Sequence, residues 1–341
     1  MSEQTKSVPN KRVRKKDDKF LEFISKPEVL TVALLILLII LMSILRPATF
    51  LTWTNFFNII RQVTLMGILA VGMGLVIVSG GIDLSVGSTT ALAACGAVYL
   101  AAMTGYTLPP YAVLLATLFI GSAIGFVNGV LIALLGIPPF IATLGMLSIG
   151  NGVALLLTHG APILYEPTWI SWFGGGFTPP LPLIGAIPIS VFVFIAVVVV
   201  GFIFANYTVT GRNVYAVGNS PRAAKLSGIK RDQVIILVYT ITGFLAGICG
   251  LLLVGQMNSA HPSFASGIEL HVIAATVIGG VSMTGGEGNI LGTAAGAILI
   301  GLLRNMFVQL SVPGAWQTIV VGIVIIGAVA IDSIRKKLAA R

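Results

Sequence analysis

The feature that most constrains this chain is a series of long apolar runs separated by short joins. VLTVALLILLIILMSIL (Val29–Leu45) and ISVFVFIAVVVVGFIFA (Ile189–Ala205) are two examples. They approach the roughly 20 apolar residues that an α-helix needs to cross a bilayer. Only 9% of the 341 residues are charged, whereas a soluble domain carries about 25%. The sequence therefore predicts an all-α polytopic membrane protein and excludes a water-soluble fold.

The apolar runs predict about ten membrane crossings. Pro, Gly and Asn mark most of the joins between them, as in TGYTLPP and LGIPPF. We expect a basic tail over 1–28, one transmembrane domain over 29–333 with a polar loop at 206–233, and a second tail over 334–341. The expected crossings lie near 29–45, 58–79, 84–103, 111–135, 139–158, 186–205, 234–256, 267–282, 288–309 and 314–332.

The basic residues are confined to three places. Of the 20 lysines and arginines, eight precede Pro27, five lie between Arg212 and Arg231, and four follow Asp332. Clusters of this kind mark the cytoplasmic side of a membrane protein. Ten crossings with a cytoplasmic N-terminus place all three clusters inside, so both termini are expected in the cytoplasm, with the protein in the inner (plasma) membrane. The net charge of +9 then reflects topology rather than a nucleic-acid partner.

Two pairs of segments resemble each other. GIDLSVGSTTALAA (Gly81–Ala94) resembles GIELHVIAATVIGG (Gly267–Gly280). IGFVNGVLIALLGIPPFIAT (Ile124–Thr143) resembles IGLLRNMFVQLSVPGAWQT (Ile300–Thr318). The copies begin five crossings apart, and an odd offset means that they point in opposite directions across the membrane. Because inverted repeats are typical of transport folds, the sequence predicts an inverted internal repeat.

The stretch SGGIDLSVGS places an acidic residue, Asp83, after two glycines at the cytoplasmic end of the second expected crossing. Glycines permit a sharp bend. Asp or Ser at the start of the next helix can cap its free N–H groups and suits the positive end of the helix dipole. We favour this structural role for Asp83 and Ser85; direct contact with a transported substrate is the alternative. Glu269 and Glu287 are expected at similar helix starts.

Five further polar residues lie within apolar runs: Arg61, Asn128, Arg304, Asn305 and Gln309. Polar groups inside a membrane normally face the interior of the helix bundle or a watery path. A hydrophilic substrate such as a sugar could use such a path. The arginines could instead extend to the membrane surface or pair with Glu or main-chain carbonyl groups, and the sequence leaves both interpretations open.

Motifs for catalysis and metal binding are absent from the sequence. It contains no HExxH pattern, no Ser-His-Asp order and no GxxxxGK[ST] phosphate loop. Cys95 and Cys249 lie inside apolar runs without a CxxC pattern. We therefore expect no catalytic residue, metal or cofactor in this chain; if ATP drives its action, another chain binds the ATP.

The longest polar stretch, GRNVYAVGNSPRAAKLSGIKRDQV (Gly211–Val234), contains a helix-start signal. Ser220 is suited to cap a helix, and Pro221 to its first position. The sequence predicts a short helix over Arg222–Leu226 that stops at Gly228. Such a helix could be a docking element for a cytoplasmic partner or part of an ordinary solvated loop.

Four motifs, taken together and in order, resemble the permease subunits of ribose-type carbohydrate ABC importers. They are GGIDLSVGS, GIPPFIATLG, AVGNSPRAAKLSGI and SGIELHVIAATVIGGVSMTGGEGNILGT, and the resemblance runs from about Asn55 to Asp332. It implies a type II ABC importer permease fold and a permease homodimer with ten crossings per chain. It also implies a separate ABC ATPase that binds ATP and Mg, and an extracytoplasmic sugar-binding protein. The expected cargo is a ribose-like pentose, a hexose or a related monosaccharide.

The resemblance also implies roles for particular residues. In that family the NSPRAAKLSGI segment is similar to the coupling helix that enters a groove on the ATPase, which assigns this role to Asn219, Arg222, Ala223, Ala224, Leu226, Ser227 and Gly228. The GGIDLSVG and GIELHVI segments flank the family's translocation path. With the polar residues inside the crossings, the expected path comprises Asp83, Ser85, Asn128, Glu269, Arg304 and Asn305.

Three alternatives remain at the level of sequence. An ion-coupled secondary transporter would need carboxylates inside the membrane, whereas the acids of this chain lie at helix ends. A membrane-embedded enzyme or sensor would need a catalytic cluster or a soluble domain. A branched-chain amino-acid ABC permease would use the same machinery, although the GIDLSVG motif favours a sugar.

Overall fold

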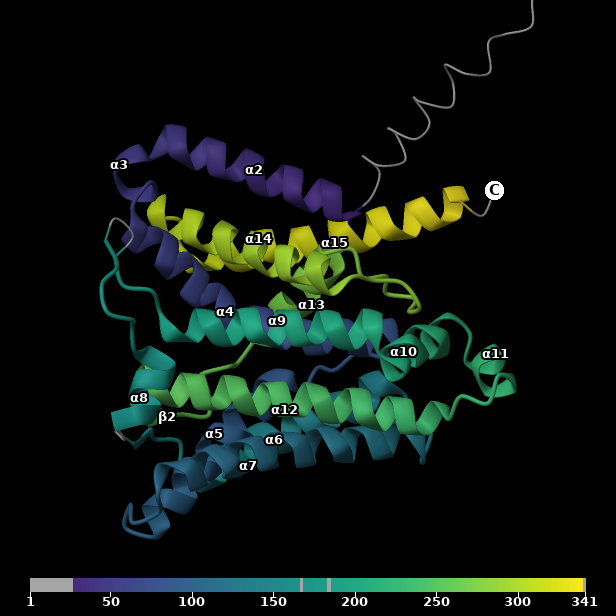
Figure 1. Cartoon of the computed structure of the whole chain (residues 1–341), viewed down its shortest axis with the longest axis horizontal. Helices are drawn as coiled ribbons and strands as arrows, with labels where there is room; N and C mark the ends of the chain where they lie inside the picture. Colours follow the sequence, from purple (N-terminus) through teal and green to yellow (C-terminus); the bar gives the residue numbers. More distant parts are fainter. Residues whose placement is uncertain (1–26, 166–167, 183–184, 340–341) are drawn as a thin grey trace, which may run out of the picture.

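The computed structural model describes residues 27–165, 168–182 and 185–339, which form a bundle of helices (Figure 1). The first 26 residues of the predicted basic tail, and residues 340–341, lie outside the described residues. The helices are α2 (Pro27–Leu45), α3 (Pro47–Phe50), α4 (Trp53–Val78), α5 (Val86–Met103), α6 (Pro110–Ala133), α7 (Pro139–Thr158), α8 (Thr168–Gly175), α9 (Ile189–Tyr207), α10 (Val209–Asn219), α11 (Pro221–Leu226), α12 (Arg231–Met257), α13 (Ile268–Ile278), α14 (Ile290–Gln309) and α15 (Gly314–Ala339).

Seven of the described helices are long and apolar enough to cross a membrane, namely α4, α5, α6, α7, α9, α12 and α14. Shorter apolar stretches lie in α2, α13 and α15. The all-α polytopic architecture is thus confirmed, and the helix bounds follow the predicted runs closely. The differences are local: α15 continues to Ala339, while α13 ends at Ile278. Helices α8 and α10 form where the sequence predicted only loops.

Local signals explain several helix starts. Proline occupies the first position of α6, α7 and α11, where its fixed φ suits a helix and its missing N–H costs nothing. Thr52 caps α4 by accepting a hydrogen bond from the amide of Asn55 at 3.2 Å. Asn289 caps α14 through the amide of Leu291 at 2.9 Å. The expectation that Glu287 marks this helix start is wrong by two residues.

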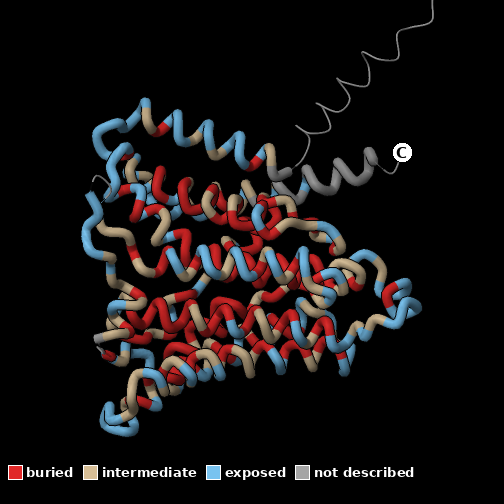
Figure 2. The backbone as a smooth tube through the Cα atoms, in the orientation of Figure 1, coloured by how far each residue is buried: buried red, intermediate tan, exposed pale blue. Residues whose placement is uncertain are grey.

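The helices α4 and α12 form the buried centre of the bundle, and the outward side of α2 is exposed (Figure 2). Helix α6 approaches α12 closely because Gly121, Gly125 and Gly129 recur on one face. A Cβ atom added at Gly125 would overlap the carbonyl oxygen of Tyr239 on α12. Small residues at four-residue spacing permit such main-chain contact between membrane helices.

The two central helices run in opposite directions (Figure 1). Helix α4 packs against α13 and α14, and α12 packs against α5 and α6. Each central helix therefore packs on the helices that follow the other one in the chain. At one end of the bundle, the short strands β1 (Ile163–Leu164) and β2 (Ser259–Ala260) pair antiparallel beside α8.

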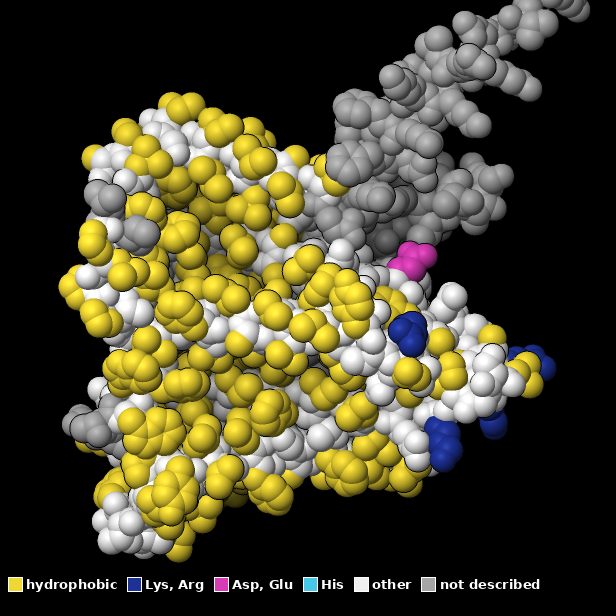
Figure 3. All heavy atoms as spheres, in the orientation of Figure 1, with side chains coloured by type: hydrophobic (Ala, Val, Ile, Leu, Met, Phe, Trp, Pro, Cys, Tyr) yellow, Lys and Arg dark blue, Asp and Glu magenta, His cyan; other side chains and the backbone are white. Residues whose placement is uncertain are grey.

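The opposite end carries the described basic residues of the polar loop. Lys and Arg side chains gather around α10 and α11, with one acidic group beside them, whereas hydrophobic side chains dominate the rest of the visible face (Figure 3). We call this the basic end, and it consists of Arg212, Arg222, Lys225, Lys230 and Arg231. An apolar flank with a basic end is what a bilayer and the cytoplasmic surface require.

Candidate functional site

Two interruptions of the helical bundle face each other. The first break, residues 79–85, separates α4 from α5; the second break, residues 261–267, leads into α13. A Cβ atom added at Gly87, in the first turn of α5, would lie 2.6 Å from both the carbonyl oxygen of Ala265 and a carboxylate oxygen of Glu269. The N-terminal ends of α5 and α13 therefore meet, and the structure brings together the two similar Gly-Ile-acidic-Leu segments of the sequence.

Asp83 is buried in the first break and is 3% exposed. Its Oδ1 accepts hydrogen bonds from the amide of Ser85 at 2.8 Å and from the hydroxyl of Ser85 at 2.6 Å. Ser85 occupies the N-cap position of α5, but its side chain makes no capping bond. The predicted capping by Ser85 is thus wrong, because its hydroxyl donates to Asp83 instead. The carboxylate bonds the main chain two residues further on, as in an Asx turn, and so fixes the break itself.

Three neighbouring helices hold the first break. Asn128 of α6 is fully buried, and its Nδ2 donates to the hydroxyl oxygen of Ser85 at 2.9 Å. The carbonyl oxygen of Ile82 accepts from the hydroxyl of Tyr239 on α12 at 3.3 Å, and the hydroxyl of Thr143 on α7 lies 3.3 Å from the same oxygen. Tyr239 did not stand out in the sequence, because it lies in an ordinary helical run. Thr143 ended one of the two repeated segments, but the sequence assigned its side chain no role.

One polar group beside the first break is left unsatisfied. The Oδ1 of Asn128 is buried and has no hydrogen-bond partner among the described residues. Burial raises the pKa of the Asp83 carboxyl, which lies in the connection between two crossings, and the hydrogen bonds from Ser85 act in the opposite direction. In the described part of the chain, no three His, Cys, Asp or Glu side chains form a group that could hold a metal ion.

The other acidic residue of the predicted path, Glu269, lies directly after the second break. Glu269 is half-buried in the first turn of α13. On the same helix, Nδ1 of His271 lies 3.0 Å from the carbonyl oxygen of Gly267. Arg304 of α14 is exposed. Glu269 therefore belongs to the surroundings of the second break, whereas the role of Arg304 in the path stays a prediction.

Asn305 belongs to a different cluster. Its Nδ2 donates to Oδ1 of Asn55 at 2.9 Å, and its Oδ1 accepts from Nε2 of Gln309 at 3.3 Å. Oε1 of Gln309 accepts from the hydroxyl of Thr49 at 2.7 Å, and Nδ2 of Asn55 donates to the carbonyl oxygen of Phe50 at 3.1 Å. This amide network joins α14 to α3 and to the start of α4, so it does not meet Asp83, Ser85 and Asn128. The role of Asn305 in a path stays a prediction.

Arg61 lies half-buried on α4, with its guanidinium 5.9 Å from the centre of the Phe177 ring. This distance permits a cation–π contact with a residue that follows α8. The structure thus gives Arg61 an aromatic neighbour, which neither interpretation of the arginines included. No ion pair of Arg61 or Arg304 is found in the described residues, where the one salt bridge joins Arg231 and Asp232.

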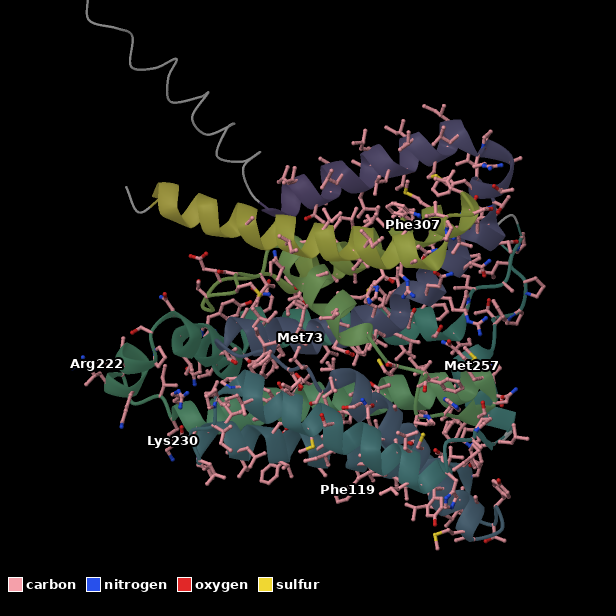
Figure 4. The ribbon with its side chains drawn as sticks, turned by 180° about the vertical axis from the view of Figure 1, so that it is seen from behind. Met73, Phe119, Arg222, Lys230, Met257 and Phe307 are labelled. Carbon is pink, nitrogen blue, oxygen red and sulfur yellow. The ribbon has the colours of Figure 1, made fainter. Side chains whose placement is uncertain are left out.

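The predicted docking helix is confirmed as a helix. Ser220 caps α11 by accepting from the amide of Ala223 at 3.3 Å, and Pro221 begins the helix. Gly228 follows it with φ +80°. Ala224 is buried against the bundle, while Leu226 is 84% exposed. The helix projects at the basic end, where Figure 4 labels Arg222 and Lys230, whereas Met257, the last residue of α12, lies toward the opposite end of the bundle.

The chain is similar to transport permeases over most of its length. A family described as "Branched-chain amino acid transport system / permease component" matches residues 55–329. The ribose import permease protein RbsC of Escherichia coli K12 is 39% identical over 303 residues, which cover 88% of this chain and 91% of the relative. RbsC of Bacillus subtilis 168 is 38% identical over 307 residues, with 89% and 92% covered.

A relative with another sugar in its name is nearly as similar. The galactose/methyl galactoside import permease protein MglC of E. coli K12 is 34% identical over 330 residues, which cover 93% of this chain and 96% of the relative. No solved structure matches the chain.

Proposed function

The chain belongs to this family of transport-system permeases, and from that membership we infer that it is the transmembrane permease subunit of an ATP-driven ABC importer for a monosaccharide. The carrying observation is the similarity to ribose and galactose import permeases across about nine-tenths of both chains. The family description mentions branched-chain amino acids, but these relatives are named for sugars. We therefore propose a ribose-like pentose, a hexose or a related sugar as the cargo.

We propose that ATP and Mg bind to a separate ABC ATPase, because the sequence contains no phosphate-loop motif. The exposed helix α11 at the basic end would enter a groove on that ATPase. Its exposed Arg222, Lys225 and Leu226 offer two charges and one apolar side chain to a partner, while Ala224 anchors it to the bundle. This chain is then a transport subunit, and hydrolysis takes place on the partner.

We also propose ten crossings per chain, cytoplasmic termini, an inverted repeat and a permease homodimer that receives sugar from an extracytoplasmic binding protein. The opposite directions of α4 and α12, and their reciprocal packing on the following helices, support the repeat. The start of α2 and the end of α15 lie on the same side of the bundle as α11, which supports a common cytoplasmic face (Figure 1).

The translocation path would pass the two breaks. Asp83, Ser85 and Asn128 offer a carboxylate, a hydroxyl and an amide, which are groups that hydrogen-bond to sugar hydroxyls. In the described conformation all three are buried, so sugar can reach them only when the breaks move apart. Closure of the ATPase dimer would supply that movement through α11, and alternation between the two conformations would carry the sugar inward.

Uptake in a strain that lacks its own ribose and galactose permeases tests this proposal. Labelled ribose and galactose should enter only when this chain, its ATPase and its binding protein are all present. The tagged chain should also co-purify with the ATPase in mild detergent. Uptake that persists without any ATPase, and that stops when a protonophore collapses the proton gradient, would instead identify an ion-coupled transporter.

A further inference from the structure

Three segments that are distant in the sequence meet by their main chains at the basic end. They are the end of α4 with the following residues (78–80), the end of α10 (218–219) and the loop between α13 and α14 (279–289). The amide of Gly286 in the loop donates to the carbonyl oxygen of Val78 at 2.8 Å. The hydroxyl of Tyr215 on α10 donates to the carbonyl oxygen of Gly288 at 3.2 Å.

Glycines allow this approach. A Cβ atom added at Gly218 would overlap the carbonyl oxygen of Val78 and lie 2.7 Å from the amide nitrogen of Gly286. One added at Gly286 would lie 2.7 Å from the Cα of Asn219. No side chain therefore separates the three segments at these points. We call this contact the glycine junction, and it consists of Val78, Gly80, Gly218, Gly285 and Gly286.

The loop that contributes Gly285 and Gly286 is held by its own hydrogen bonds. The amide of Ser282 donates to the carbonyl oxygen of Glu287 at 3.0 Å, and the amide of Gly285 donates to that of Ser282 at 3.0 Å. Gly285 also packs against the first segment, since a Cβ atom there would lie 3.1 Å from the Cα of Gly80. The loop is thus held both by internal hydrogen bonds and by its packing against the first segment.

The junction lies between α11 and both breaks. Gly218 comes two residues before Ser220, the cap of α11. Val78 is the last residue of α4, directly before the first break. The loop follows α13, which begins at the second break. A displacement of α11 therefore reaches the first break directly through Val78, and it reaches the second break through the loop and helix α13.

We propose that the glycine junction transmits the movement of α11 to both breaks, and that Gly218 and Gly286 are positioning residues for coupled transport. Close-packed main chains cannot absorb a displacement by changing rotamers, so they pass it on. This inference rests on the proposed function, because it needs an ATPase that moves α11. Beyond that function, the inference names the residues through which the single docking helix α11 acts on both breaks.

The test compares Gly218→Ala with Gly152→Ala in the complete importer, reconstituted in liposomes with its co-purified ATPase and its sugar-binding protein. Both glycines are helical, but a Cβ atom at Gly152 meets nothing within 4 Å. We expect G218A to assemble and to hydrolyse ATP at the basal rate, while the amount of sugar moved per ATP falls about tenfold or more. The matched variant G152A should keep the wild-type ratio.

A second, milder variant is Tyr215→Phe, which keeps every glycine and removes only the hydrogen bond to Gly288. We expect assembly to be unchanged and sugar moved per ATP to fall several-fold. Wild-type coupling in an assembled G218A would overturn the inference. If G218A does not accumulate in the membrane, wild-type coupling in Y215F would overturn it. A wild-type chain that recruits no ATPase would contradict the proposed function and, with it, the junction. Wild-type coupling in an assembled variant would contradict the junction alone, so the two failures can be told apart.

Discussion

Replacing Ser85 by alanine should destabilise the protein through the break that Asp83 holds. The hydroxyl of Ser85 donates to Oδ1 of Asp83 at 2.6 Å and accepts from Nδ2 of Asn128 at 2.9 Å, and all three residues are buried. A hydrogen bond to a charged group contributes about 1.5–3 kcal/mol, and a buried donor left unpaired costs about 1–3 kcal/mol. Bonds between membrane helices average only about 0.6 kcal/mol, so we expect a loss of about 2–4 kcal/mol in the free energy of unfolding.

The sign of a second substitution makes the test sharp. In the wild type, Asn128→Leu removes one hydrogen bond and should cost about 1 kcal/mol. In the S85A background, both polar atoms of the Asn128 amide lack a partner, so the same change should stabilise the protein by about 1–2 kcal/mol. Titration of the purified protein with a denaturing detergent, followed by circular dichroism, measures all four free energies of unfolding.

Ser88 supplies the control. It is also buried near the start of α5, but its hydroxyl donates only to the carbonyl oxygen of Ser85 at 3.0 Å. S88A should therefore cost about 1 kcal/mol or less. The reasoning fails if S85A costs no more than S88A, or if Asn128→Leu has the same effect in both backgrounds.

Three further predictions concern other contacts. Gly125→Leu should prevent accumulation in the membrane, because even a Cβ atom there overlaps the carbonyl oxygen of Tyr239, whereas Gly145→Leu meets open space and should accumulate normally in an immunoblot. Arg222→Glu combined with Lys225→Glu should abolish co-purification with the ATPase without lowering the thermal unfolding midpoint, since both side chains are exposed. Unchanged co-purification would show that these two charges do not contribute to docking. Asn305→Ala should lower the free energy of unfolding by about 1–3 kcal/mol, because it removes the hydrogen-bond donor to Oδ1 of Asn55, but it should leave the KM for sugar unchanged; a raised KM would support a role for Asn305 in the path.

The sequence predicted the features that depend on local physics. Run length and flanking prolines placed α7 at Pro139–Thr158, as the structure has it. The Ser220-Pro221 pair predicted α11 because capping involves only neighbouring residues. Helix α10 escaped prediction, since its short polar sequence contains two glycines and lacks a long apolar face. Helix α8 was missed for a similar reason: it is short and lies in a loop rich in Pro and Gly.

The candidate site depended on contacts that span the chain, so it could be predicted only in part. Asp83, Ser85 and Asn128 stood out as polar residues in apolar surroundings, and the structure joins them. Nothing in the sequence indicated that Asn305 would instead bond to Asn55, 250 positions away. The partners of Ile82 were equally hidden, because a main-chain carbonyl carries no sequence signal at all.

The charge on Asp83 can be explained by the break rather than by a bound partner. In a chain with so few charges, a carboxylate inside the bundle is costly unless nearby donors compensate it. A continuous helix would leave no main-chain amide free for it, since each amide bonds within the helix. The break frees the amide of Ser85, and the start of α5 adds the positive end of a helix dipole. The break therefore offsets part of the cost of burying the carboxylate, and the carboxylate in turn holds the break through its hydrogen bonds to Ser85. A transporter needs such an element, since a segment outside regular helix can change conformation at a lower cost than the helices on either side.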